Sequence, residues 1–140
     1  MESNYISMEY FKKRMVDLCL RSGLSDFPTK RRDQLIILKS ISVAFEPGKQ
    51  YLEPEVNEEI KSWLADINCF PGWDYLMLRR RLVDDGFLTR NRDGSFYWVN
   101  PSGPAEMVFD PAIIELDINE VLAEGKNMIA EKKAAYQQNH

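Results

Sequence analysis

The side chains best suited to binding chemistry in this sequence are arginines and lysines that occur in short groups. The groups are Lys30-Arg31-Arg32, Arg79-Arg80-Arg81, and Arg90 with Arg92. The planar guanidinium of arginine donates paired hydrogen bonds to phosphate oxygens or to the edge of a guanine base. These groups therefore indicate contact with nucleic acid, on a chain whose formal net charge is −4.

The acidic residues that give the chain its negative charge are concentrated near the C-terminus. Residues 101–140 carry seven acidic and three basic side chains, whereas residues 26–100 carry twelve and eleven. The segment that holds the arginine groups is therefore almost neutral. A near-neutral domain can present one positive face when its acidic residues lie elsewhere.

Residue types that support catalysis or metal binding are scarce. The only histidine is His140, and Cys19 and Cys69 are fifty residues apart in sequence. This set is too small for a structural zinc site, and a disulfide is not expected in a reducing compartment. The sequence also contains no glycine-rich phosphate loop, no G-x-S-x-G and no H-E-x-x-H. We therefore expect no enzyme, no metal site and no cofactor.

Composition and length place the chain among globular proteins with a substantial core. Its 140 residues are 44% hydrophobic and 29% charged. The longest aliphatic run, Leu35–Leu38, is far shorter than the roughly 20 residues of a membrane span. The acidic N-terminal residues do not resemble a signal peptide. We expect a cytoplasmic protein without a membrane segment.

The elements that must position the arginines are mostly helices. Apolar residues recur at intervals of three and four residues, which is typical of helices with one buried face. We expect helices from Ser7 to Arg21, from about Thr29 to Pro47-Gly48, from Glu53-Pro54 to Ile67, from Asp74 to Gly86, and from Asp117 onward. Ser7, Asp74 and Asp117 are predicted to cap the N-termini of their helices.

Strand-forming residues flank a turn after the fourth helix. Phe87–Arg90 and Ser95–Val99 are separated by Asn91-Arg92-Asp93-Gly94, in which Asp-Gly supplies a positive φ. This pattern predicts a β-hairpin with Arg90 and Arg92 at or beside its tip. A further short strand is expected at Lys49–Leu52.

The order helix, short strand, helix, helix and hairpin is that of a winged helix-turn-helix domain. In that domain the third helix enters the DNA major groove and the hairpin lies along the backbone. The expected fold class is α+β and mainly α, with a core of three helices plus a β-hairpin wing and with extra N- and C-terminal helices. We expect a flanking helix over 1–25, the winged-helix domain over 26–100, and a linker with an acidic amphipathic helix over 101–140.

A string of short motifs in this segment resembles a bacterial family of unknown function. The motifs are Phe27-Pro28, Lys30-Arg31-Arg32, Phe45-Glu46-Pro47-Gly48, Glu55-Val56-Asn57, Leu78-Arg79-Arg80, Asp93-Gly94-Ser95 and Tyr97-Trp98. Members of that family are often fused behind the helix-turn-helix of transcription regulators. The resemblance implies a winged-helix-like core and an association with transcription, but no chemistry. The chain departs from the family pattern in its longer link around Cys69–Trp73 and its acidic tail.

The arginines of the fourth helix differ in the direction they are expected to face. On a helical wheel Arg80 and Arg81 lie opposite the apolar residues, where they either contact nucleic acid or form a solvated face. Arg79 falls in the apolar sector, so we expect its stem to pack on the core and its guanidinium to pair with a carboxylate. Arg90 and Arg92 at the tip of the hairpin, and the group Lys30-Arg31-Arg32, either bind phosphates or are solvated surface residues.

Two functions of different classes fit these observations. The first is a small DNA-binding protein that helps regulate transcription, with double-stranded DNA as its partner. The second is a protein-interaction or assembly module, with Phe70, Trp73 and Met77 in the long link and fourth helix either binding a partner or capping the core. In either case the two terminal helices are expected to pack together and to form a two-fold homodimer.

Overall fold

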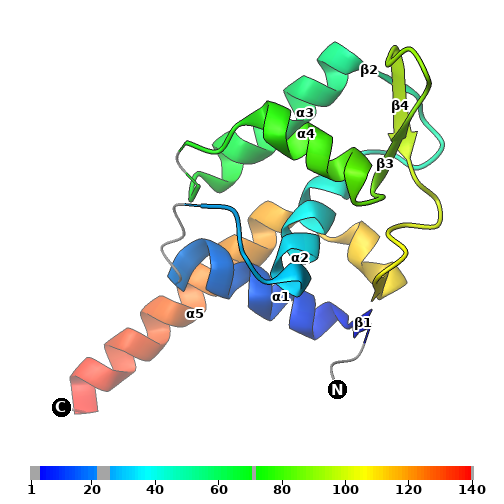
Figure 1. Cartoon of the computed structure of the whole chain (residues 1–140). Helices are drawn as coiled ribbons and strands as arrows, with labels where there is room; N and C mark the ends of the chain where they lie inside the picture. The colour runs from blue at the N-terminus through cyan, green and yellow to red at the C-terminus, as the bar shows by residue number, and fades with distance from the viewer. Residues whose placement is uncertain (1–3, 22–25, 71, 140) are drawn as a thin grey trace.

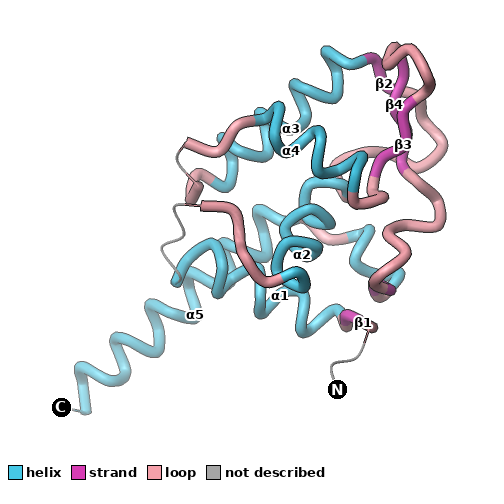
Figure 2. Tube along the Cα trace, viewed as in Figure 1, coloured by secondary structure: helices cyan, strands magenta, loops and turns pink. Residues whose placement is uncertain are grey.

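The computed structural model describes residues 4–21, 26–70 and 72–139, and over these residues the protein is α+β and mainly helical (Figures 1 and 2). The α-helices are α1 (Met8–Val16), α2 (Arg31–Ser42), α3 (Glu53–Ile67), α4 (Tyr75–Asp84) and α5 (Ile118–Asn139). A π-helical turn, η1 (Asp17–Arg21), continues α1, and a 3-10 segment, η2 (Pro111–Glu115), precedes α5. The predicted number and order of long helices is therefore confirmed.

Three short strands form an antiparallel sheet beside α3 and α4. These strands are β2 (Tyr51–Leu52), β3 (Leu88–Arg90) and β4 (Phe96–Val99), and their order in the sheet is β2-β4-β3. In this register Leu52 lies opposite Phe96, and Thr89 lies opposite Trp98. The predicted hairpin and the short strand before the third helix are both confirmed.

A second sheet was not predicted from the sequence. It consists of β1 (Tyr5–Ile6) and β5 (Val108–Phe109), which pair in parallel. Each strand is only two residues long, so neither carries an alternating pattern that identifies a strand. The pair fixes the start of the chain against the segment that follows the hairpin.

The helix boundaries follow local chemistry at most ends. Ser7 accepts a hydrogen bond from the Tyr10 amide at 3.1 Å, and Asp74 accepts one from the Leu76 amide at 2.9 Å. Asp117 accepts a hydrogen bond from the Asn119 amide at 3.0 Å. These three predicted caps are confirmed. The second helix ends earlier than expected, at Ser42, because tighter turns replace the helical pattern before Pro47.

One hydrophobic core joins the terminal elements to the central ones. It contains fully buried residues from the N-terminal, central and C-terminal parts of the chain, among them Ile6, Phe11, Met15, Leu35, Ile41, Leu78, Leu82 and Ile113. The flanking helices are thus part of the same core as the segment expected to be a winged helix.

The two terminal helices pack against each other, as expected (Figure 1). At their contact, a Cβ on Gly125 would lie only 2.6 Å from Cγ2 of Val16. Gly125 weakens α5 by its flexibility, but here the absence of a side chain permits the close approach of α1. Figure 1 shows the C-terminal half of α5 extending beyond the other helices.

Candidate nucleic-acid interface

Arg79 is a structural residue that joins α4 to α3. Its Nη1 donates a hydrogen bond to Oδ1 of Asn57 at 2.6 Å and lies 3.0 Å from Oε1 of Glu53. Only 17% of its side chain is exposed. The prediction that Arg79 packs on the core and pairs with a carboxylate is confirmed.

Arg81 faces the body of the protein more than the sequence suggested. Its guanidinium carbon lies 4.6 Å from the centre of the Phe27 ring, in a cation–π contact. Its Nη1 is 3.8 Å from Oδ2 of Asp85, one turn further along α4. Phe27 comes from the segment before α2, so a helical wheel of α4 alone could not show this contact.

Arg80 is the arginine of α4 that points away from the core. Leu78 and Leu82 are fully buried, and two residues beyond Leu78 the helix has turned by about 200°. Arg80 is exposed, and it makes no ion pair, hydrogen bond or ring contact with any residue that the structure describes. Leu76 and Asp84 are the other exposed side chains on this side of α4. This surface is therefore mixed rather than strongly basic.

Arg31 binds carboxylates from two other parts of the chain. Its Nε donates a hydrogen bond to Oε2 of Glu106 at 2.9 Å, and its Nη2 donates one to Oδ1 of Asp85 at 3.0 Å. The bonds to Glu106 and Asp85 raise the pKa of Arg31, and the bond from Arg31 lowers the pKa of Glu106. Arg31 thus holds α2, α4 and the segment after the hairpin together.

The other two residues of this basic group lie in different surroundings. Arg32 donates a hydrogen bond to the Tyr5 carbonyl at 3.3 Å, and its guanidinium lies 4.8 Å from the centre of the Tyr10 ring. Lys30 is exposed at the N-terminus of α2 and makes no side-chain cap hydrogen bond. Of the three, Lys30 is the most available to a phosphate.

The hairpin tip presents Arg90 and Arg92 to solvent on a turn held by hydrogen bonds. Oδ1 of Asn91 accepts a hydrogen bond from the Phe96 amide at 3.0 Å, and Oδ1 of Asp93 accepts one from the Ser95 amide at 3.0 Å. Bonds from Ser95, its hydroxyl first, lower the pKa of Asp93. Gly94 has a φ of +75°, as predicted for this turn. The turn therefore holds its two arginines on a well-defined backbone.

The aromatic residues of the long link form a stack against the core. The Phe70 and Trp73 rings are 3.9 Å apart and nearly parallel, and Phe70 also stacks on Trp63 at 6.0 Å. The Phe27 ring lies 5.4 Å from the Trp73 ring and is tilted by 49° to it. Phe70 is only 5% exposed, and Met77 packs against the core from α4. The stack favours the core-capping role over the partner-binding role for this group.

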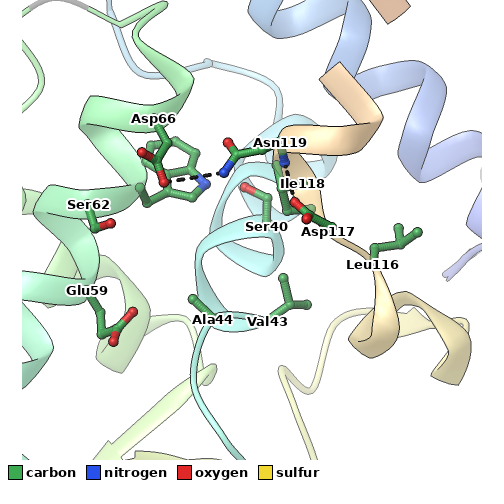
Figure 3. A pocket seen from close by; sticks show the side chains of 11 residues that line it. Ser40, Val43, Ala44, Glu59, Ser62, Asp66, Leu116, Asp117, Ile118 and Asn119 are labelled. Carbon is green, nitrogen blue, oxygen red and sulfur yellow. Dashed lines mark hydrogen bonds between the residues drawn. The ribbon is translucent and has the colours of Figure 1, made fainter. Parts of the chain in front are cut away.

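A small pocket with both polar and apolar lining residues lies between α2, α3 and the start of α5 (Figure 3). Its volume is about 240 Å³, and Ser40, Ser62, Asp66 and Asn119 are among its lining residues. Nδ2 of Asn119 donates a hydrogen bond to Oδ2 of Asp66 at 3.3 Å (Figure 3). Among the described residues, no three histidine, cysteine or acidic side chains lie close enough together to hold a metal ion. No helix in the described part of the chain is long and apolar enough to cross a membrane.

Sequence reasoning missed the influence of the two cysteines on each other. Cys19 in η1 is buried and Cys69 in the link after α3 is partly buried, and both are free thiols. The interaction between them raises the pKa of Cys19 and lowers the pKa of Cys69. Their separation of fifty residues in sequence gave no signal of this influence.

Comparison with known proteins identifies one family. A bacterial family described as "Uncharacterized protein conserved in bacteria (DUF2087)" matches residues 23–99, which is more than half of the chain. The matched residues run from before α2 to the end of β4, so they contain the three-stranded sheet and three of the helices. No curated protein and no solved structure matches the chain.

Proposed function

The chain belongs to this bacterial family, DUF2087, and from that premise we propose that it is a winged-helix DNA-binding protein with a role in transcription regulation. The observation that carries the proposal is the arrangement of the matched segment. Its elements follow the order α2, β2, α3, α4, β3 and β4, and its sheet has the order β2-β4-β3. This arrangement suits a fold in which α4 enters the major groove and the hairpin follows the DNA backbone.

The side chains that carry this function are exposed cations of the matched segment. In this proposal Arg80 contacts base edges in the major groove, and Arg90, Arg92 and Lys30 contact phosphates. Each of the four is exposed. Arg31, Arg32 and Arg81, which the sequence placed in the same set, make protein contacts that hold the framework of α2 and α4. They add positive potential rather than direct contacts in this proposal.

The number of available cations sets the expected salt dependence of DNA binding. With three phosphate contacts at ~0.9 each, the affinity of one protomer for duplex DNA is expected to fall about 40-fold between about 50 and about 200 mM salt. Fluorescence anisotropy on a random duplex across a salt series measures this slope. Arg90→Ala and Arg92→Ala are each expected to weaken binding and to reduce the slope by about 1, and Arg80→Ala is expected to weaken binding through the loss of a groove contact.

Lys133→Ala is the matched control, because it removes one positive charge from an exposed position on α5. It is expected to leave both affinity and slope close to those of the unaltered protein. Equal losses in the Arg80 and Lys133 variants indicate binding through overall charge and contradict the proposed interface. Absence of binding at low salt, where attraction is least screened, rejects the DNA-binding function.

A second function, as a protein-interaction or assembly module, has one observation in its favour. Leu52 and Phe96 lie opposite each other on the sheet and are 48% and 37% exposed, and Leu76 on α4 is 42% exposed. These apolar side chains suit a protein surface better than a phosphate backbone. Absence of DNA binding at low salt favours this second function.

Homodimer formation through the terminal helices is part of the proposal. Met128 on α5 is 57% exposed, and it lines a groove of about 400 Å³ between α1 and α5 together with Val16 and Ile129. Sedimentation equilibrium at micromolar concentration is expected to show a dimer, and Met128→Glu is expected to yield monomer because it places a charge in an apolar contact. If the protein sediments as a monomer at all concentrations, the proposed homodimer is contradicted.

A further inference from the structure

The pocket between α2, α3 and the start of α5 is lined by side chains from three segments of the chain (Figure 3). α3 contributes residues spaced by three and four positions, which lie on one side of a helix: Glu59, Ser62, Trp63 and Asp66. Ser40 from α2, with Asp117 and Asn119 from the start of α5, adds further polar groups to the lining. The packing of three segments therefore brings together polar side chains that are far apart in sequence.

The charged residues of this pocket are all acidic. Glu59, Asp66 and Asp117 line it, and no lysine or arginine is among the described residues that do so. Oδ1 of Asp117 accepts a hydrogen bond from the Asn119 amide, and Oδ2 of Asp66 accepts one from the Asn119 side chain. Glu59 is partly buried and makes no ion pair or hydrogen bond with any residue that the structure describes. A partly buried carboxylate without a partner favours a cation beside it.

The cation that fits this pocket is a small organic ammonium rather than a metal ion. The described acidic side chains are not close enough together in threes to coordinate a metal. The pocket, at about 240 Å³, has the volume of roughly eight water molecules, each of which takes up about 30 Å³. It therefore suits a ligand of roughly six to eight non-hydrogen atoms.

A buried donor in the same pocket has no acceptor. Trp63 is only 6% exposed, and its Nε1 is buried without a hydrogen-bond partner among the described residues. A buried tryptophan N–H usually finds a partner, because an unpaired donor loses its bonds to water without replacement. Since Trp63 lines the pocket, an oxygen atom of a bound molecule can supply the acceptor. This donor points to a ligand that combines a cationic group with a neutral oxygen.

The lining of the pocket includes one weak contact that can open. Nδ2 of Asn119 and Oδ2 of Asp66 are 3.3 Å apart, which is long for a hydrogen bond, and both side chains are exposed. The same two residues line a neighbouring pocket of about 230 Å³, so their separation joins the two spaces. Because Nε1 of Trp63 is itself covered, a ligand oxygen reaches it only when a lining side chain moves. The Asp66–Asn119 contact provides that movement at low cost.

We propose that this pocket binds a small hydroxylated amine, a compound with one ammonium group and at least one hydroxyl group. Its ammonium pairs with the carboxylate of Glu59, and Asp66 adds negative potential. A hydroxyl oxygen of the ligand accepts the hydrogen bond from the Trp63 indole. The hydroxyls of Ser40 and Ser62, which also line the pocket, suit a ligand hydroxyl as well. A ligand bound here contacts three segments of the fold, so saturating ligand is expected to raise the Tm of the protein.

The test uses the full chain, labelled with nitrogen-15 and kept in phosphate buffer at neutral pH, with the aminopropanediol serinol as the probe. The three tryptophans give three indole N–H peaks in an NMR spectrum, and the variants Trp63→Phe and Trp98→Phe assign two of them. Serinol is expected to shift the Trp63 peak in a saturable way, because a new hydrogen bond changes the chemical shift of that proton. Trp98 lies on β4, so its peak is the internal control and is expected not to shift.

Two compounds of similar size separate the contributions of the ammonium and hydroxyl groups. Glycerol has a hydroxyl in place of the ammonium of serinol, and isopropylamine keeps the ammonium but lacks both hydroxyls. Each is expected to bind about tenfold more weakly than serinol, because each lacks one of the two partners that the pocket requires. The dissociation constants come from the same titrations.

Variants of two neighbouring glutamates test the position of the cation. Glu59→Gln removes the charge of the pocket carboxylate but keeps its shape, and it is expected to weaken serinol binding about tenfold. Glu58→Gln removes the same charge from the next position of α3, which is 75% exposed and outside the pocket lining. It is the matched control and is expected to change the Kd by less than about twofold. In Trp63→Phe, serinol and isopropylamine are expected to bind with similar affinity, because the ligand hydroxyl has lost its donor.

Any of three results overturns the proposal. These are a Trp63 peak that serinol does not shift, glycerol binding as tight as serinol binding, or equal losses of affinity in the Glu58 and Glu59 variants. The comparison of the three compounds uses the unaltered chain, so it decides the question even if Glu59→Gln fails to fold. None of these measurements depends on DNA binding, so this proposal and the proposed function fail separately.

Discussion

Arg14→Met is expected to lower the free energy of unfolding by about 3 kcal/mol, because breaking a buried ion pair leaves an uncompensated charge. Asp33 is 7% exposed, and its two carboxylate oxygens each accept a hydrogen bond from Arg14, both at 3.1 Å. This bidentate pair joins α1 to the first turn of α2. Methionine keeps most of the apolar stem but removes both donors. The measurement is urea unfolding, read from the midpoint at an unchanged m-value.

The neighbouring residue provides the matched control. Lys13 is exposed, so Lys13→Met removes the same charge and is expected to change stability by less than about 0.5 kcal/mol. The double variant Arg14→Met, Asp33→Leu removes the whole pair and is expected to recover most of the loss. Equal effects of the Arg14 and Lys13 variants would show that the pair contributes nothing beyond net charge.

Trp73→Ala is expected to cost about 3 kcal/mol of stability, the usual effect of removing a packed aromatic side chain. Trp73 lies between Phe70 and Phe27 in the aromatic stack, with ring distances of 3.9 Å and 5.4 Å. Its removal exposes the buried face of Phe70 and loosens the link that leads into α4. Thermal unfolding followed by circular dichroism measures the loss.

Leu76→Ala tests whether this effect is specific to the stack. Leu76 is also a large apolar residue close to the link, but it is 42% exposed, so its truncation is expected to change stability by less than about 0.5 kcal/mol. If Trp73→Ala changes the free energy of unfolding as little as Leu76→Ala does, the Trp73 side chain does not contribute to core packing. That result favours the partner-binding role for this group.

The stack also contributes to the connection between α3 and α4, which is longer than the one expected for a helix-turn-helix unit. Helix-turn-helix units join their helices by about 3–4 residues, whereas α3 ends at Ile67 and α4 begins at Tyr75. Phe70 and Trp73 pack the extra residues against Trp63 and Phe27. Arg79 adds a second connection, through its bonds to Asn57 and Glu53. Together these contacts fix α4 against α3 despite the longer link.

The features that the sequence by itself determined are those set by neighbours along the chain. Caps at Ser7, Asp74 and Asp117 and the turn at Gly94 depend on residues within a few positions, so their residue types identify them. Arg79 could be assigned to the core because helical periodicity alone places it beside Leu78 and Leu82. The order of the long helices and of the strands in the three-stranded sheet followed from the same local patterns.

Only the tertiary structure decided which polar side chains meet. Arg80 and Arg81 were both placed outside the apolar sector of the helical wheel, yet Phe27 from another segment lies beside Arg81 while Arg80 is exposed. The bonds of Arg31 to Asp85 and Glu106 join residues 54 and 75 positions apart. Such contacts depend on how whole helices pack against one another. Helical periodicity indicates which face of a helix is buried, but it does not indicate which residue of another segment lies against that face.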